Sequence, residues 1–108
     1  FLLFSTITSA GVPADKQHEI NHLLTFVAQS TCLLERNGKK HNGSDAVEHI
    51  KKKYDYFRYK INSAETFIEY SATKSTLSGK YYKVHCPKQR TVKTQAWLLN
   101  ELAGYRSR

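Results

Sequence analysis

The sequence is short of several features that would assign it to a class at once. Beyond its apolar start, no stretch of the 108 residues approaches the roughly 20 consecutive apolar residues of a membrane-spanning helix. It contains no internal repeat, no linker-like segment and no low-complexity tract. Its two prolines and five glycines are an ordinary number for a folded chain. We therefore expect one small domain that does not span a membrane.

Acidic residues are scarce. The chain has nine Asp and Glu against seventeen Lys and Arg, which gives a net charge of +8. A charge of this sign favours encounter with anionic partners, although it says nothing about the fold. We expect the partner to be a protein or an anionic component of the cell envelope, such as lipid headgroups or an acidic polysaccharide.

Cysteine is limited to Cys32 and Cys86. In a small exported domain such a pair favours a disulfide, and the chain-entropy model gives a bridge over a loop of this length about 4 kcal/mol. The alternative is two buried free thiols.

Export is inferred from the start of the chain, which carries no charge before Asp15. Val12 and Ala14 occupy the −3 and −1 positions of a cleavage after Ala14, as at the end of a secretory signal peptide. Residues 1–14 are therefore predicted to be a signal-peptide remnant, with a hydrophobic arm packed on the domain as the alternative. Residues 15–108 are predicted to form a single helical domain.

Two helical patterns occupy the first half of the chain. The first runs from Asp15 to about Leu34 and gives way to residues 36–43, where Asn-Gly occurs twice. The second is capped by Ser44 or Asp45. Its apolar face consists of Ala46, Val47, Ile50, Tyr54, Phe57 and Ile61.

Two further helices are predicted in the second half. One begins after a Ser63 cap, and the other covers residues 94–105. The inner stripe of the third helix consists mainly of small residues that allow close packing: Ala64, Ile68, Ser71, Ala72 and Ser75. In the last helix, the inward side chains are Leu98, Leu102 and Tyr105.

Residues 71–86 are predicted to leave the third helix, turn near Gly79 and then extend, with Tyr82, Val84 and Cys86 on one side. Residues 90–93 could fold back on this segment as a minimal hairpin. The expected fold is therefore mainly α: a small four-helix domain with one short extended segment or minimal hairpin, tied by a disulfide.

His18, Glu19 and His22 spell the H-E-x-x-H signature of zinc hydrolases. That chemistry requires both histidines to face a cleft, whereas helical spacing places them opposite the apolar stripe, facing solvent. No third ligand is marked out in the sequence. We predict no metal site, and a metal-dependent hydrolase is the least favoured function.

Other catalytic patterns are incomplete. Either cysteine could be paired with His41, His49 or His85, but the cysteines are expected to bond to each other. Ser75 to Lys80 loosely resembles the Ser-x-x-Lys motif of acyl-transferring enzymes, without its companion elements. A phosphate-binding loop is absent as well. We predict no catalytic residue, no cofactor and no enzymatic activity.

A basic and aromatic stretch lies along the second helix. Rings and cations alternate over residues 54–60, as in some nucleic-acid-binding surfaces. Because part of this stretch belongs to the apolar face, and because export separates the protein from nucleic acid, we predict no nucleic-acid partner. The basic face of this helix, a candidate for anionic lipid or glycan, consists of Lys51, Lys52, Lys53 and Arg58.

Several short motifs occur together along the chain: Ser30-Thr31-Cys32, Arg36-Asn37-Gly38, Ser78-Gly79-Lys80, Tyr82, Val84, Cys86 and Trp97-Leu98. In this combination they resemble the family known as domain of unknown function 5329. The resemblance covers nearly everything from Asp15 to Arg106. Two positions depart from the family pattern: Tyr81 stands where Pro is usual, and Leu34 stands where an aromatic residue is usual.

The resemblance implies a short exported protein of a Gram-negative bacterium, periplasmic or secreted, with Cys32 bridged to Cys86. It implies no particular activity. The bridge would bring two polar loops to the same region, and we predict a candidate binding surface there for a carboxylate, a phosphate or an acidic side chain. Its residues are Arg36, Asn37, Lys39, Lys40, Ser75, Ser78, Gly79, Lys80 and Tyr82.

A structural role for the same loops is the somewhat favoured alternative, with Arg36 and Asn37 capping the first helix and holding the Ser-Gly turn. At the level of function, we predict a non-catalytic exported binding module, of inhibitor or immunity type, that presents polar loops to a protein partner. The alternative is an envelope factor that binds anionic lipid or glycan through the basic helix face.

Overall fold

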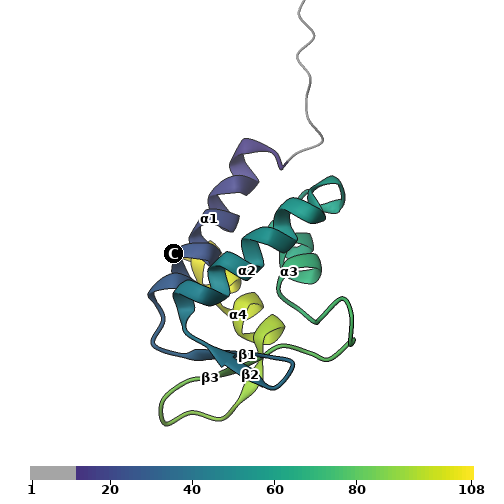
Figure 1. Cartoon of the computed structure of the whole chain (residues 1–108). Helices are drawn as coiled ribbons and strands as arrows, with labels where there is room; N and C mark the ends of the chain where they lie inside the picture. The colour runs from purple at the N-terminus through teal and green to yellow at the C-terminus, as the bar shows by residue number, and fades with distance from the viewer. Residues whose placement is uncertain (1–11) are drawn as a thin grey trace, which may run out of the picture.

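The computed structural model describes residues 12–108, which form four α-helices and one four-stranded antiparallel sheet (Figure 1). The helices are α1 (Ala14–Gln29), α2 (Gly43–Tyr56), α3 (Ala64–Ser71) and α4 (Thr94–Arg106), with a 3₁₀ turn η1 at Arg58–Lys60. The strands are β1 (Leu33–Arg36), β2 (Lys39–His41), β3 (Lys83–His85) and β4 (Val92–Lys93). The expectation of a mainly α domain with one extended segment is therefore wrong, because the fold is mixed α/β.

The helices gather on one side of the sheet (Figure 1). The strand order is β2-β1-β3-β4, so the two central strands come from opposite halves of the chain. The predicted signal-peptide remnant, residues 1–14, lies almost wholly outside the described residues; of its last residues, Val12 packs against the core and Ala14 begins α1.

The first helix ends earlier than predicted. It stops at Gln29, and Leu33–Arg36 form β1 instead of a last helical turn. Leu34, which fitted the helical stripe, is buried from a strand: it pairs with His41 of β2 on one side and Val84 of β3 on the other. Because β1 hydrogen-bonds to two neighbours, its tertiary pairing outweighs the helical pattern.

A two-residue hairpin joins β1 to β2. Asn37 (φ 52°) and Gly38 (φ 82°) both adopt the left-handed region, as a type I′ turn requires, and Arg36 pairs with Lys39 across it. The first Asn-Gly is thus a hairpin turn and caps no helix. The second supplies the cap of α2, where the Asn42 side chain accepts a 2.9 Å hydrogen bond from the Asp45 N–H, and the predicted Ser44 or Asp45 cap is wrong.

Gly43 sets how closely α1 and α2 approach. A Cβ atom at this position would lie 2.2 Å from the carbonyl oxygen of Val27 and 3.1 Å from that of Ala28. The start of α2 therefore rests directly on the backbone of the last turn of α1, and a residue with no side chain is required at the contact.

The burial predicted for the second and third helices is largely confirmed, but both helices are shorter than predicted. Ala46, Val47, Ile50, Tyr54 and Ile61 are buried and Phe57 is partly buried, although α2 ends at Tyr56. All five small-stripe residues are buried, although α3 ends at Ser71 and leaves Ala72 and Ser75 outside the helix. The Ser63 cap of α3 is confirmed as a capping box in which Ser63 and Thr66 each bond the other's backbone N–H. Phe67, on the same helix, is among the largest fully buried side chains, and Tyr54 meets its ring edge-on.

The extended segment and its partner are also confirmed. Tyr82 and Val84 are buried while Tyr81 and Lys83 are exposed. Residues 92–93 pair antiparallel with β3 as β4, inside the predicted 90–93 segment. A disulfide joins Cys32, just before β1, to Cys86, just after β3, so the bridge lies across the two central strands. Within the described residues, no helix is both long enough and apolar enough to cross a membrane.

Candidate functional site

The two polar loops meet. The Asn37 side chain, in the β1–β2 turn, donates to Ser75 Oγ at 3.3 Å and accepts from Ser78 Oγ at 2.6 Å. Two backbone N–H groups close the second loop: Ser78 N–H donates to Ser75 Oγ, and Lys80 N–H donates to Ser78 Oγ. Gly79 turns with φ 74°. Asn37, Ser75 and Ser78 therefore hold the loops together, while the neighbouring Lys39 and Lys80 are exposed.

Lys53 does not lie on an exposed basic face. Its Nζ donates to the carbonyl of Lys74 at 2.7 Å and to the Tyr82 hydroxyl at 3.2 Å, and it lies 5.1 Å from the centre of the Tyr82 ring. Partial burial, and then the nearby Arg36, lower the pKa of this ammonium. Lys53 thus links α2 to both ends of the second polar loop.

His49 completes a polar cluster with Lys53 and Tyr82. Its Nε2 lies 3.1 Å from the Tyr82 hydroxyl, and the two rings meet edge-on at 5.9 Å. Burial, followed by the charges of Arg36 and Lys53, lowers the pKa of His49 to about 4. At neutral pH the imidazole is therefore uncharged, beside the basic side chains of Arg36 and Lys53.

A cavity of about 30 Å³ opens beside this cluster, between the β1–β2 hairpin and the first turns of α2. Its lining is Leu34, Glu35, Arg36, His41, Asp45, Ala46, His49, Ile50, Tyr82 and Thr94. Thr94 is 1% exposed, and its hydroxyl has no hydrogen-bond partner among the described residues. Its backbone N–H, by contrast, donates to the Tyr82 carbonyl at 3.0 Å.

Charge pairing around the cavity is incomplete. Glu35 bonds to His85 at 2.6 Å, and this bond lowers the pKa of the carboxyl. Asp45, at the exposed rim, forms no ion pair within the described chain, and neither do Arg36 and Lys53. The site holds two cations that no carboxylate of the described residues neutralises at close range.

The three lysines predicted for the loop surface do not all lie on the same face of the protein. Lys39 and Lys80 are exposed beside the joined loops. Lys40 lies next to Lys39 on β2 and pairs with Glu35, so it points to the opposite face of the hairpin. No lysine within residues 12–108 takes part in an ion pair.

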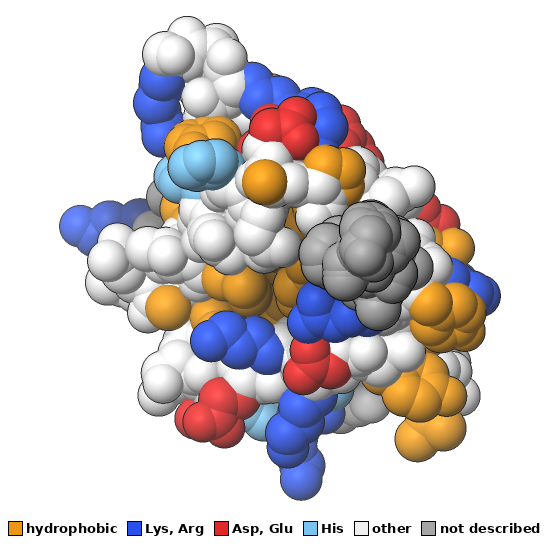
Figure 2. Space-filling model, turned by 90° about the horizontal axis from the view of Figure 1, so that it is seen from above, with side chains coloured by type: hydrophobic (Ala, Val, Ile, Leu, Met, Phe, Trp, Pro, Cys, Tyr) orange, Lys and Arg blue, Asp and Glu red, His pale blue; other side chains and the backbone are white. Residues whose placement is uncertain are grey.

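The four predicted basic residues of α2 do not share one exposed surface. Lys51 and Lys52 are exposed, Lys53 is turned inward, and Arg58 donates to Asp55 at 2.9 Å while packing over the Tyr54 ring. On the face of the molecule opposite the sheet, Figure 2 shows Lys and Arg side chains interspersed with Asp and Glu. The described Lys and Arg side chains visible on this face do not form a continuous patch.

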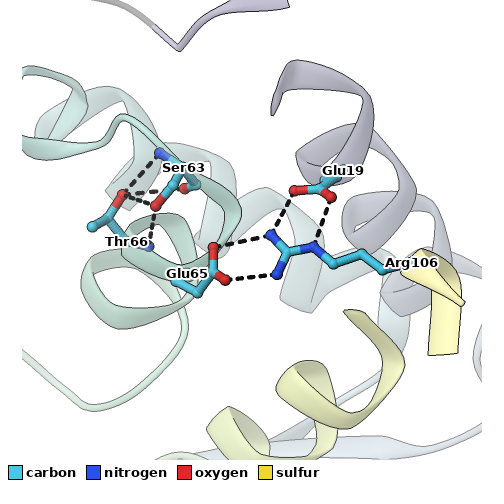
Figure 3. A network of polar contacts seen from close by, with 5 residues as sticks. All are labelled: Glu19, Ser63, Glu65, Thr66 and Arg106. Atoms are coloured by element: carbon cyan, nitrogen blue, oxygen red, sulfur yellow. Dashed lines mark hydrogen bonds and ion pairs between the residues drawn. The ribbon is translucent and has the colours of Figure 1, made fainter. Parts of the chain in front are cut away.

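Two of the three H-E-x-x-H residues, Glu19 and His22, are engaged in other contacts. His18 is exposed, but His22 lies 2.7 Å from Glu101 and stacks on Tyr105 at 4.0 Å, so the expectation that both face solvent is wrong for His22. Glu19 is bound by Arg106 of α4, which also holds Glu65 of α3 (Figure 3). No group of three or more potential metal ligands occurs in the described part of the chain.

Two residues of the site were not assigned to it from the sequence: His49 was considered only as a partner for a cysteine, and Thr94 only as the start of the last helix. His49 lies next to Ile50 of the apolar face and four residues before Lys53. Side chains four residues apart lie on the same side of a helix, so His49 and Lys53 can contact the same neighbour. That spacing is a usable signal. Thr94 carries none, because its place in the cavity lining depends on the pairing of β3 with β4 and on its N–H bond to the Tyr82 carbonyl.

Comparisons with known proteins agree with the resemblance seen in the sequence. The model of a family of unknown function, DUF5329, matches residues 14–106. The uncharacterized protein YfeK of Salmonella typhimurium is 38% identical over 82 residues, which cover 75% of this chain and 68% of that protein. No solved structure matches the chain.

Proposed function

The chain belongs to the DUF5329 family, and we propose that it is a non-catalytic exported binding module that presents its joined polar loops to a protein partner. An inhibitor or immunity-type role suits a small, bridged domain of this kind. The periplasm, or the medium outside a Gram-negative cell, is the proposed location. The Cys32–Cys86 bridge supports it, since disulfides persist in oxidising compartments.

The observation that carries the proposal is a rigid surface with unpaired positive charge. Asn37 fixes the two loops to each other through Ser75 and Ser78, so little ordering is required on binding. Around this tie, Arg36, Lys39 and Lys80 make no ion pair within residues 12–108. An acidic surface of a partner would complement this charge and accelerate association.

A pair of matched variants tests the proposal. The bridged protein is immobilised and exposed to cell-envelope extract, and retained proteins are identified and cross-linked to it. Lys39→Gln/Lys80→Gln removes two charges at the loops, while Lys51→Gln/Lys52→Gln removes two exposed charges elsewhere. We expect one retained protein whose binding weakens about tenfold or more in the loop variant only. Equal loss in both variants, or no specific cross-link to either loop, would refute the loop surface.

The basic helix face remains the alternative, as a surface for anionic lipid or glycan. It is less well supported because Lys53 and Arg58 are engaged within the protein. Binding to vesicles that contain anionic lipid distinguishes this alternative from the proposed loop surface. Under the alternative, the Lys51→Gln/Lys52→Gln variant would lose binding that is steeply salt-dependent. Under the proposed function, neither variant binds such vesicles.

A further inference from the structure

We propose that the cavity between the β1–β2 hairpin and α2 binds a carboxylate group, held by Arg36 and by the hydroxyls of Tyr82 and Thr94. This goes beyond the proposed function, because the carboxylate could belong to a free carboxylic acid as well as to an acidic side chain of a protein partner. The joined loops could bind a protein without the cavity, and the cavity could bind an acid without the loops.

Size narrows the ligand to one small group. The cavity measures about 30 Å³. A bound water requires roughly 10–15 Å³, so there is room for two or three waters or for the oxygens of one carboxylate. Pockets for whole metabolites are roughly ten times larger. A sugar ring or a nucleotide does not fit, whereas the end of an acidic side chain or of a short acid does.

Charge selects an anion. Arg36 lines the cavity, and Lys53 bonds to the hydroxyl of Tyr82, another lining residue. The positive charges of both residues lower the pKa of His49, which also lines the cavity. Of the two carboxylates in the lining, Glu35 is bound by His85, and exposed Asp45 contacts neither cation within ion-pair distance. Arg36 is therefore available for a paired hydrogen bond to carboxylate, the geometry a guanidinium favours. Asp45 at the rim disfavours a doubly charged ion.

The strongest single observation is the Thr94 hydroxyl. Thr94 is one of the residues that line the cavity, and its hydroxyl is almost completely buried with no hydrogen-bond partner in residues 12–108. A buried hydroxyl without a partner costs free energy, and an acceptor placed in the cavity would recover it. The Tyr82 hydroxyl lies on the same lining and is already close to His49 and Lys53. A carboxylate is an acceptor for the Thr94 hydroxyl and for Arg36. The Tyr82 hydroxyl can donate to it as well when His49 carries its proton on Nε2 and donates to the tyrosine oxygen.

The test is a titration followed by NMR on the intact, bridged protein. Sodium acetate is compared with sodium chloride at equal ionic strength, near pH 6. We expect saturable shifts of the Thr94 amide and the His49 ring with acetate but not with chloride. The His49 pKa should rise from about 4, because the new anion offsets the charges of Arg36 and Lys53. The other groups facing the ring are His41, Asp45, Lys52 and Tyr82.

Substitutions at Thr94 locate the site. Thr94→Val keeps the shape and removes the hydroxyl, so acetate should bind about tenfold more weakly. Thr94→Ser should restore most of the affinity. Lys51→Gln, an exposed control on the same helix, should leave it unchanged. Shifts that are linear in acetate, or identical in the Val and Ser variants, would overturn the proposal, as would tighter binding of inorganic phosphate than of acetate.

A third arm identifies the source of the group. A short blocked peptide with one Glu is titrated beside acetate. Tighter binding of the peptide assigns the cavity to an acidic side chain of a partner, and equal binding assigns it to a free acid. Failure of both ligands rejects the cavity as a site while leaving the envelope-extract experiment on the loops untouched.

Discussion

His49 should give the protein a distinctive pH dependence. Burial and the neighbouring cations lower its pKa from 6.5 to about 4. Between these values the unfolded chain binds a proton at His49 that the folded chain does not. The free energy of unfolding should therefore fall as the pH is lowered from 6.5 towards 4. Because the ring is partly exposed to solvent, we expect about 1 kcal/mol over this window. Urea unfolding at several pH values measures it.

The matched variant is His49→Gln, which retains a group able to bond the Tyr82 hydroxyl but does not titrate. Its loss of stability between pH 6.5 and 4 should be smaller than that of the native protein. Three carboxyl groups also have lowered pKa values: Glu19, Glu35 and Glu65. Their protonation reduces the free energy of unfolding only as the pH falls below the usual value near 4.5, and both proteins contain all three. Parallel curves for the two proteins above pH 5 would contradict the assignment to His49.

Among the helices, the contact between α1 and α2 is the least tolerant of added volume. At Gly43 a methyl group would meet the Val27 carbonyl at 2.2 Å, so backbone must move. Gly43→Ala should lower the free energy of unfolding by about 2 kcal/mol. Gly104→Ala is the control: it lies inside α4, with nothing nearer than 3.9 Å, and should stabilise by about 0.5–1 kcal/mol. Urea midpoints that move in the same direction would refute this account.

Arg106 ties three helices at their ends. Its guanidinium donates to both oxygens of Glu19 on α1 and both oxygens of Glu65 on α3 (Figure 3). Arg106→Ala should cost about 1 kcal/mol, since the network is partly exposed to solvent. Arg106→Lys should recover less than half, because an ammonium cannot serve two carboxylates in parallel pairs.

The control for Arg106 is its neighbour Arg108, whose contact with Glu101 is longer, at 3.4 Å, and more exposed. Arg108→Ala should change the thermal midpoint very little. If the two alanine variants lose the same stability, the three-helix tie contributes nothing beyond ordinary surface charge.

Elements with local signals could be predicted from the sequence, and those defined by pairing could not. The Ser63 cap and the apolar faces of α2 and α3 depend on residues within a few turns, and they were predicted. The β1–β2 hairpin was missed although Asn37-Gly38 marks its turn. Its strands have only four and three residues, and Lys39–His41 has no apolar alternation to reveal a strand. Leu34, which suited the helix, is buried from β1.

The site shows the same division. The meeting of the loops around Asn37 and Ser78 follows from the bridge and could be predicted. The inward turn of Lys53 could not, since it depends on the carbonyl of Lys74 and the hydroxyl of Tyr82. Nor could the buried hydroxyl of Thr94, because its position depends on the pairing of β3 with β4 and on the bond of its N–H to the Tyr82 carbonyl.

For the whole molecule, the disulfide should supply a large share of the stability. Cys32 and Cys86 are 54 positions apart, and closing such a loop in the unfolded chain is worth up to about 4 kcal/mol. Reduction should therefore lower the urea midpoint strongly, with a mass gain of two hydrogens in the intact chain. Domains of this size have about 5–10 kcal/mol in total, so the reduced form should be marginal.

The control is Cys32→Ser/Cys86→Ser, whose midpoint should match that of the reduced protein and should not respond to reductant. If reduction leaves the midpoint of the native protein unchanged, the bridge is incidental to the fold.

The same bridge makes the chain a covalent ring with two tails, and most of the exposed loops lie within the ring. Leu77, 98% exposed at the tip of the second polar loop, is where a protease would first find the backbone. A cut there would produce two chains that stay joined through Cys32 and Cys86. Ser75 would remain on one chain and Ser78 on the other, with Asn37 bonded to both. The proposed binding surface would thus survive the nick, which would become visible only on a reducing gel.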